Sequence, residues 1–190
     1  MGEKIDTLGD ALPREIARVR DEVLPEYLAI GPAGIFAATM MRQSLDLASK
    51  AMIEGDSLRL GAVEIRLHGI DAPEMDQVCH RSGKPWRCGV VAAAELRKLI
   101  DGRAVDCTPV VQSDGSTTDR YGRVLGRCSV AGVELNAWMV EQGLAVAFVR
   151  YSAQFVPQED RARQARRGMW AGEFQAPWDF RREKAAKRGR

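Results

Sequence analysis

The chain has 190 residues, of which 45% are hydrophobic and 28% are charged. This composition excludes a wholly disordered chain, which would be poorer in apolar residues, and a membrane bundle, which would be poorer in charged ones. A chain of this length most often holds one domain with an appendage, and its formal net charge of +2 favours no class of partner by itself.

The first fifty residues have helical periodicity. Apolar residues recur every three or four positions from Leu12 to Val23 and again from Met41 to Met52, with a Gly- and Pro-containing break at residues 31–34. We therefore expect a helical extension over residues 1–50, whose role is open between packing, self-association and docking of a partner. The chain lacks the run of roughly 18 to 20 apolar residues that a membrane-spanning helix needs, and no basic segment precedes its most apolar window, so we expect no signal peptide.

From about Glu54 the helical period gives way to alternation. Leu58 and Leu60, then Val63, Ile65 and Leu67, flank a Gly-Ala pair and predict a hairpin. Further along the chain, the patterns predict helices over residues 89–100, 135–142 and 157–167, and strands over 105–111, 123–130 and 145–149. Short strands interrupted by a few helices indicate an α+β fold, mainly β, in which a small closed or partly open barrel occupies residues 51–180.

The last ten residues, RREKAAKRGR, contain six basic side chains and one acidic side chain. Such a basic tail over residues 181–190 could attract a polyanion by releasing counterions, or it could be a solvated, disordered terminus. We expect the three residues Trp138, Trp170 and Trp178, which lie before this tail in apolar contexts, to pack in the core.

The four cysteines form no CxxC pair, and the chain has only two histidines, so a zinc site has little support. Cys79 and Cys88 bracket a loop, whereas Cys107 and Cys128 fall on segments predicted to be strands that neighbour one another. Two disulfides are one hypothesis, and free buried thiols are the other.

Three segments supply what a metal-assisted attack on a phosphodiester requires. They are Glu54-Gly55-Asp56-Ser57, the stretch from Ile65 to Glu74 (IRLHGIDAPE), and Asp119-Arg120-Tyr121-Gly122-Arg123. Each has an ordinary explanation alone, because Gly and Asp favour turns and an exposed arginine is usually solvated. Together they offer carboxylates for a hard cation, a carboxylate for the attacking water and guanidinium groups for the phosphate. His68, within the second segment, is interpreted as an ordinary strand residue.

These segments, with LNAWMVEQGLA and ARQARRGMW further on, resemble the thermonuclease family of staphylococcal nuclease-like domains over about residues 53–178. The resemblance implies a five-stranded OB-fold barrel with about three helices. It also implies a calcium-dependent phosphodiesterase that cuts DNA and RNA internally, with little sequence specificity, and leaves 3′-phosphate ends.

The resemblance assigns a role to each matching residue. It implies that Ca²⁺ is held by Asp56, by Asp71, by the backbone carbonyl of Ala72, and through a water by Glu74, which also orients or deprotonates that water. Catalytic arginines are implied at Arg66 and Arg123, phosphate contacts at Arg120 and Tyr121, and aromatics flanking a base at Phe148 and Tyr151.

Other hypotheses remain open at this point. The helical period that continues into Glu54 predicts a short or replaced first strand, which would displace Asp56 and weaken metal binding. The barrel would then be a module that binds single-stranded DNA or RNA without cutting it. The family and the possible disulfides suggest an extracytoplasmic location, whereas the expected lack of a signal peptide suggests the cytoplasm.

Overall fold

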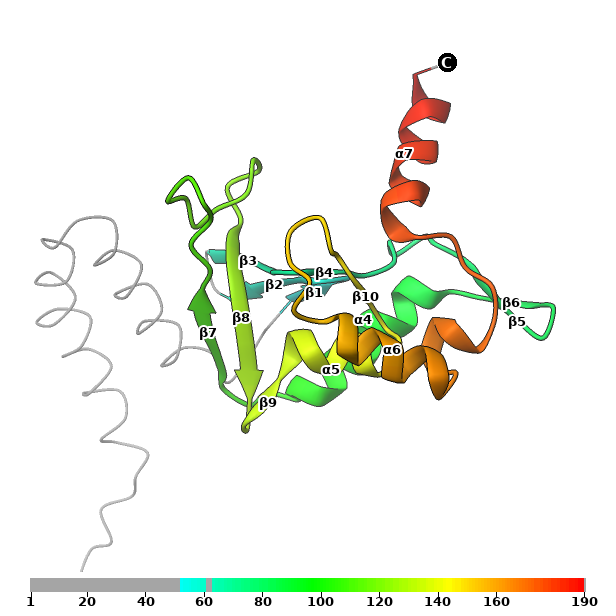
Figure 1. The fold of residues 1–190 in the computed structure, drawn as a ribbon, viewed down its shortest axis with the longest axis horizontal. Coiled ribbons are helices and arrows are strands. Elements are labelled where there is room, and N and C mark those ends of the chain that lie inside the picture. The colour runs from blue at the N-terminus through cyan, green and yellow to red at the C-terminus, as the bar shows by residue number, and fades with distance from the viewer. Residues whose placement is uncertain (1–51, 61–62, 190) are drawn as a thin grey trace, which may run out of the picture.

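The computed structural model of the chain describes residues 52–60 and 63–189 (Figure 1). The expected N-terminal helices, over residues 1–50, lie outside the described residues. Within the described ranges, no helix combines the length and the apolar character that crossing a membrane requires.

The main sheet has the strand order of an OB-fold. It runs through β1 (Met52–Glu54), β2 (Ser57–Leu60), β3 (Val63–Leu67), β8 (Val124–Val130) and β7 (Val105–Pro109), and β9 (Val133–Glu134) also pairs with β8. Strands β1, β2 and β3 form an antiparallel meander, β8 lies parallel to β3, and β7 lies antiparallel to β8. This order confirms the predicted five-stranded OB-fold.

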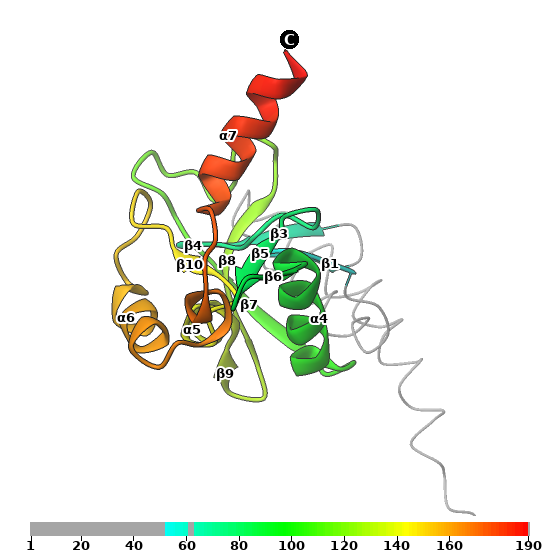
Figure 2. The ribbon, with the colours of Figure 1, turned by 90° about the vertical axis from the view of Figure 1, so that its right-hand side faces the viewer.

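Two small sheets and four α-helices complete the described fold (Figures 1 and 2). The sheets pair β4 (Ile70–Asp71) with β10 (Val146–Ala147), and β5 (Cys79–Arg81) with β6 (Lys84–Trp86). The helices are α4 (Cys88–Ile100), α5 (Leu135–Glu141), α6 (Val156–Gln164) and α7 (Pro177–Arg188), with a 3₁₀-helix η2 (Gly168–Ala171) before α7. Both views show α7 projecting away from the barrel.

Alternation along β3 decides what faces the core and what faces the site. Ile65 and Leu67 are fully buried, so Arg66 between them points to the opposite face. Gly126 on β8 allows the parallel strand to approach, because a Cβ there would lie 2.8 Å from Cγ2 of Ile65. Burying each leucine or isoleucine stabilises the fold by about 1.5 to 3 kcal/mol. The core joins the barrel strands to buried residues of the two helices α4 and α5 and of the loop before α6, among them Leu96, Ile100, Leu135, Met139 and Phe155.

The start of the domain differs from its prediction only in part, because the first strand is short, as expected, but it is not replaced. Residues 52–54 form strand β1, paired with residues 57–59, so the helical period that continues into Glu54 was misleading. A three-residue strand is too short to show a period of its own, and its pairing with β2 determines its structure. Gly55, at φ +59°, makes the tight turn that leads into Asp56.

The end of the domain also differs. The predicted closing helix corresponds to α6, which ends at Gln164, but it is not the last helix. Residues 181–188, predicted to be part of a separate tail, belong to α7, so residues 52–189 contain four α-helices where about three were expected. Pro177 at the start of α7 fits a first helical turn, where its missing N–H costs nothing.

Both disulfides are present. Cys79 on β5 is bonded to Cys88 at the start of α4, and Cys107 on β7 is bonded to Cys128, its register partner on β8. No cysteine is free, so the hypothesis of free thiols is not supported.

Candidate active site

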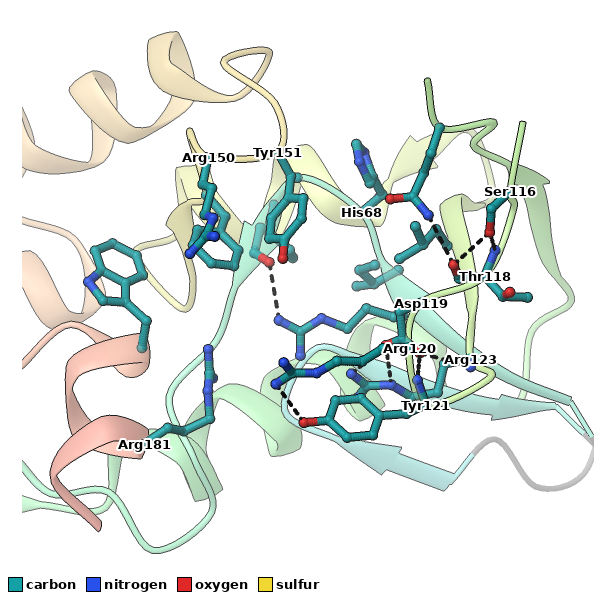
Figure 3. Close-up of a pocket in the computed structure, with 18 of the residues that line it drawn as sticks. His68, Ser116, Thr118, Asp119, Arg120, Tyr121, Arg123, Arg150, Tyr151 and Arg181 are labelled. Atoms are coloured by element: carbon teal, nitrogen blue, oxygen red, sulfur yellow. Dashed lines mark hydrogen bonds and ion pairs between the residues drawn. The ribbon is translucent and has the colours of Figure 1, made fainter. Parts of the chain in front are cut away.

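An open pocket of about 1240 Å³ lies where β3, the β7–β8 loop, the loop after β10 and α7 meet (Figure 3). It gathers seven of the predicted site residues: Arg66, Glu74, Arg120, Tyr121, Arg123, Phe148 and Tyr151. The two predicted aspartates, Asp56 and Asp71, are buried behind Arg66, with 3% and 0% of their surfaces exposed.

Arg66 connects the two buried aspartates. Its Nη1 donates to Oδ1 of Asp56, and its Nη2 donates to Oδ1 of Asp71 at 2.9 Å. Asp56 also accepts the backbone N–H of Ala72 at 2.9 Å. The β1–β2 turn, β3 and β4 thus converge on one charged cluster, and the short β1 has not displaced Asp56.

The environment of Asp56 alters its protonation. Burial raises the pKa of this carboxyl to about 6, although the positive charge of Arg66 opposes the rise. The negative charge of Asp71 raises it further, because two buried carboxylates repel one another. The site therefore holds more negative charge than Arg66 alone neutralises.

Arg123 is held on two sides at the start of β8. The carboxylate of Asp119 accepts its Nε at 2.8 Å, and Ser57 on β2 accepts its Nη1 at 3.1 Å. Asp119 also accepts the backbone N–H groups of Tyr121 and Arg123, at 2.9 and 3.0 Å. Burial alone would raise the pKa of Asp119, but these hydrogen bonds and the charge of Arg123 hold it below its ordinary value.

The β7–β8 loop also presents a cation and a ring to solvent. Nη2 of Arg120 donates to Oη of Tyr121 at 2.7 Å, and 68% of Tyr121 is exposed. The guanidinium groups of Arg120 and Arg123 lie 4.8 and 5.4 Å from the centre of the Tyr121 ring. The ring therefore orients both arginines through cation–π contacts.

Three aromatic rings form one wall of the pocket. Phe148 and Tyr151 pack edge to face, with centroids 4.9 Å apart. The ring of Trp178 on α7 stacks parallel to Phe148 with a centroid distance of 5.4 Å. Trp178 was predicted to pack in the core; it does touch a small apolar cluster, but it lines this pocket.

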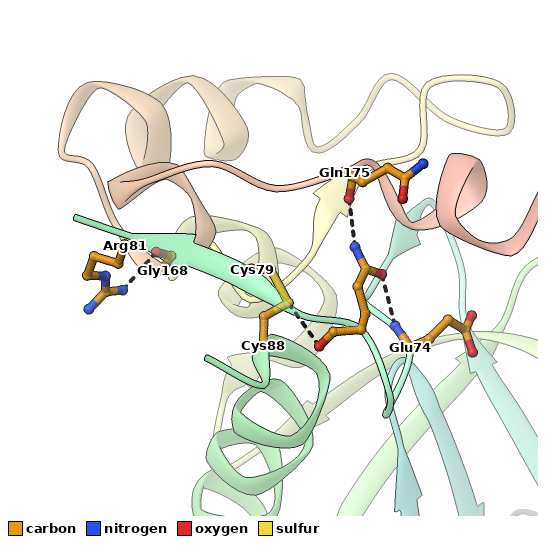
Figure 4. The surroundings of a disulfide bond; sticks show 7 residues. Glu74, Cys79, Arg81, Cys88, Gly168 and Gln175 are labelled. Atoms are coloured by element: carbon orange, nitrogen blue, oxygen red, sulfur yellow. Dashed lines mark hydrogen bonds between the residues drawn. A yellow bond between two sulfur atoms is a disulfide. The ribbon is translucent and has the colours of Figure 1, made fainter. Parts of the chain in front are cut away.

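Glu74 lies in a turn that buried contacts hold (Figure 4). Gln77 is fully buried; its backbone N–H donates to the carbonyl of Glu74 at 2.8 Å, and its side-chain oxygen accepts the N–H of Glu74 at 3.3 Å. Sγ of Cys88 lies 3.5 Å from the carbonyl oxygen of Gln77. A Cβ on Gly89 would lie 1.9 Å from the Glu74 carbonyl oxygen, so α4 packs directly against this turn.

Arg181 on α7 is the residue at the site that sequence reasoning missed. Its Nη1 and Nη2 donate to Oδ1 and Oδ2 of Asp71 at 3.0 and 2.8 Å, and Nη1 also donates to Oε1 of Glu74 at 2.9 Å. Burial would lower the pKa of Arg181, but its bonds to the two carboxylates raise it above the ordinary value. Gln77 was missed too, because a lone glutamine gives no signal of burial.

His68 lies one residue beyond β3 and faces the pocket (Figure 3), so it is not an ordinary strand residue. Burial lowers the pKa of its imidazole. Its carbonyl accepts Nδ2 of the buried Asn136 at 2.9 Å, which ties the end of β3 to α5.

The chemistry of the donors suits a hard cation such as Ca²⁺, which prefers carboxylate and carbonyl oxygens. Asp56, Asp71 and Glu74 supply such oxygens next to the backbone of Ala72. Across the described part of the chain, however, no three acidic, histidine or cysteine side chains are arranged as a ready-made metal site. Guanidinium groups bridge the carboxylates instead.

Comparisons with known proteins agree with this architecture. Residues 64–172, more than half of the chain, match the family model described as staphylococcal nuclease homologue. The chain is 37% identical to staphylococcal-like nuclease CAN1 of Arabidopsis thaliana over 123 residues, which are 63% of this chain and 33% of that protein. It is 31% identical to an uncharacterized endonuclease of Escherichia coli over 141 residues, 70% of this chain and 82% of that protein.

A third relative is the succinoglycan biosynthesis protein ExoI of Rhizobium meliloti (strain 1021), 33% identical over 103 residues, which are 53% of this chain and 51% of that protein. The chain therefore spans about half of ExoI and about a third of CAN1.

Proposed function

Because the chain belongs to the staphylococcal nuclease homologue family, we propose that it is a calcium-dependent nuclease that hydrolyses internal phosphodiester bonds of DNA and RNA with little sequence preference. Products with 3′-phosphate ends are part of this proposal. Its substrates would be single-stranded or denatured nucleic acids, whose bases are free to meet the aromatic wall.

One observation carries the proposal. A single guanidinium, that of Arg66, is bonded to two buried carboxylates at the base of a pocket that Arg123 also lines. Structural ion pairs seldom bury two carboxylates around one arginine, since removing these charges from water is costly. Ionisable groups buried together at a pocket are candidates for a functional site, and here the carboxylates would bind a cation and the arginines a phosphate.

Each residue has a role that its position supports. A calcium ion held by Asp56, Asp71 and the Ala72 carbonyl would act as a Lewis acid on a phosphate oxygen. Glu74, next to that cluster, would orient the attacking water or accept its proton. Arg66 and Arg123 present planar forks that match the oxygens of the transition-state phosphorus, where one well-placed donor contributes about 3 to 4 kcal/mol.

The exposed groups would hold the polymer. Arg120 and Tyr121 would contact a neighbouring phosphate, and Phe148 and Tyr151 would flank a base. Stacking on aromatic rings tolerates any base, which supports broad specificity. The stacked pair of Phe148 and Trp178 also favours the second candidate, a module that binds single strands without cutting them.

The two disulfides support action in an oxidising, extracytoplasmic setting, because such bonds seldom persist in a reducing cytosol.

The test is hydrolysis of heat-denatured DNA and of RNA by purified protein, in calcium and in excess EGTA, beside Glu74→Gln. Glu141→Gln, which changes a partly exposed glutamate that pairs with Arg161 and Arg167 outside the pocket, is the matched control. We expect cutting only in calcium, a loss of at least about 100-fold in Glu74→Gln, and no change in the control. Binding of denatured DNA without cutting at any calcium concentration would instead support the binding module.

A further inference from the structure

Helix α7 places a positive charge on the carboxylates of the proposed cation site. We propose that Arg181 is a built-in counter-cation that competes with the divalent metal for Asp71 and Glu74, so that α7 closes the site until the metal displaces it. This inference rests on the proposed function and concerns the regulation of its metal site.

The contacts of Asp71 leave little room for both cations. Its Oδ2 accepts Arg181 at 2.8 Å, and its Oδ1 accepts both Arg181 at 3.0 Å and Arg66 at 2.9 Å. Asp71 is fully buried, so water cannot supply an alternative partner. A metal ion that took an oxygen of Asp71 would therefore have to replace a guanidinium.

Of the two guanidinium groups, that of Arg181 is the easier to displace. Arg66 is on a central strand, and its side chain is 17% exposed, whereas the Arg181 side chain is 38% exposed. Arg181 also holds Glu74 at 2.9 Å, and that side chain is 36% exposed. Withdrawing Arg181 would free both Asp71 and Glu74 while the Arg66 bridge stayed in place.

One face of α7 carries the contacts that dock it. Trp178, Arg181 and Lys184 follow one another at intervals of three residues, so they lie on the same face. Trp178 stacks on Phe148. Arg181 binds Asp71 and Glu74, and Lys184 pairs with Asp76. Just before the helix, the carbonyl of Gln175 accepts Nε2 of the buried Gln77 at 2.7 Å. The turn that carries Glu74 is thus tied to the entry of α7 as well as to the helix.

Burial of apolar side chains contributes little to the docking of α7. Pro177 is the only buried residue of α7, and both views show the helix standing away from the barrel (Figures 1 and 2). An element that docks through polar contacts, one ring stack and the edge of a small apolar cluster opens at a lower free energy than a core helix does. Metal binding and undocking of α7 are therefore linked, and each changes the equilibrium of the other.

The first test is a calorimetric calcium titration of the whole chain without nucleic acid. Arg181→Ala should bind calcium at least about tenfold more tightly than wild type, in the usual range of coupling between two sites. Arg181→Gln, which keeps most of the side-chain volume, should do the same. Arg182→Ala is the matched control, because Arg182 is 80% exposed and pairs with Asp179 instead, and its affinity should stay within about twofold of wild type.

The outcomes separate this inference from the proposed function. Equal calcium affinities in wild type and both Arg181 variants would overturn the inference alone. An equal increase in calcium affinity in Arg182→Ala would also overturn the inference, because loss of any nearby positive charge would then explain the effect. Failure of every protein to bind calcium would overturn the calcium requirement itself, and the inference with it.

Hydrogen exchange over residues 177–188 gives a second readout that does not depend on cleavage. In EDTA, wild type and Arg182→Ala should protect these amides more than Arg181→Ala does. Calcium should lower the protection in wild type toward that of Arg181→Ala. Protection that neither calcium nor the Arg181 substitution changes would contradict a displaceable α7.

Discussion

Asp119 holds the side chain of Arg123 in place, since its Oδ2 accepts Nε of that arginine at 2.8 Å. The same carboxylate fixes the turn between the two residues through the backbone N–H of Arg123. It lies in the pocket beside the arginine and is a positioning residue in the proposed reaction.

Asp119→Asn should slow cleavage by about 10- to 100-fold, because misplacing a reacting group by about 1 Å costs that much. The loss should fall on kcat, with KM for denatured DNA nearly unchanged, since Arg120 and Tyr121 still meet the polymer. Steady-state kinetics on a short single strand measures both constants. A rise in KM alone would assign Asp119 to substrate binding instead.

The same substitution should give a pH-dependent loss of stability. The folded pKa of Asp119 lies below its ordinary value of 3.8, so its stabilisation is present above pH 3.8 and is lost as the pH falls through the folded pKa. We expect Asp119→Asn to be less stable than wild type by about 1 to 2 kcal/mol at pH 7, and we expect this difference to shrink as the pH falls below 3.8. Urea unfolding across this range provides the measurement; a difference that stays constant with pH would contradict the account.

Gly89→Ala should destabilise the domain and slow cleavage. Alanine has a helix propensity about 1 kcal/mol better than glycine, but its Cβ would lie 1.9 Å from the Glu74 carbonyl. Relieving that overlap costs about 1 to 3 kcal/mol or more and moves the Glu74 turn. Thermal unfolding and cleavage rates test both effects.

The matched control for Gly89→Ala is Val91→Ala, because Val91 is exposed on the same helix. Its stability should stay within about 0.5 kcal/mol of wild type. A stabilised, fully active Gly89→Ala would show that α4 does not press on Glu74.

Removing either disulfide should lower stability by a similar amount, but the two removals should have different effects on the cleavage rate. Their loops span 9 and 21 residues, and chain entropy gives each about 3 kcal/mol, within about 1 kcal/mol of the other. Only Cys88 lies against Gln77, which holds Glu74. Replacing Cys79 and Cys88 by serine should therefore slow cleavage more than replacing Cys107 and Cys128, at a temperature where both proteins remain folded. Equal rates in the two variants would contradict this link.

Much of the site could be predicted because it depends on local pattern. Alternation of apolar residues predicted the strand that carries Arg66, and the resemblance to the family assigned roles to Arg66, Asp71 and Glu74 within one short segment. The pairing of Cys107 with Cys128 was one of two hypotheses, suggested by their positions on predicted neighbouring strands, and the structure confirms it.

The rest depends on contacts between distant parts of the chain. Arg181 lies 110 positions after Asp71, and the face that α7 presents to the pocket is set by the loop before it. Trp178 was assigned to the core for the same reason, because an aromatic residue at a helix start has the same sequence signal in either place. Whether the first strand was short or replaced could not be decided from the sequence, because only its pairing with β2 distinguishes β1 from the end of a helix.

The measurement that tests the central claim most directly compares calcium-dependent cleavage of denatured DNA by wild type, Arg123→Lys and Arg127→Lys. Arg127 is on β8, which begins directly after Arg123, but it pairs with Glu134 and lies outside the pocket. Lysine keeps the charge but not the planar fork, so Arg123→Lys should lose about 100- to 1000-fold in rate, while Arg127→Lys cuts at the wild-type rate. Equal rates in all three, or no cutting by a wild type that binds the strand, would contradict the proposed nuclease site.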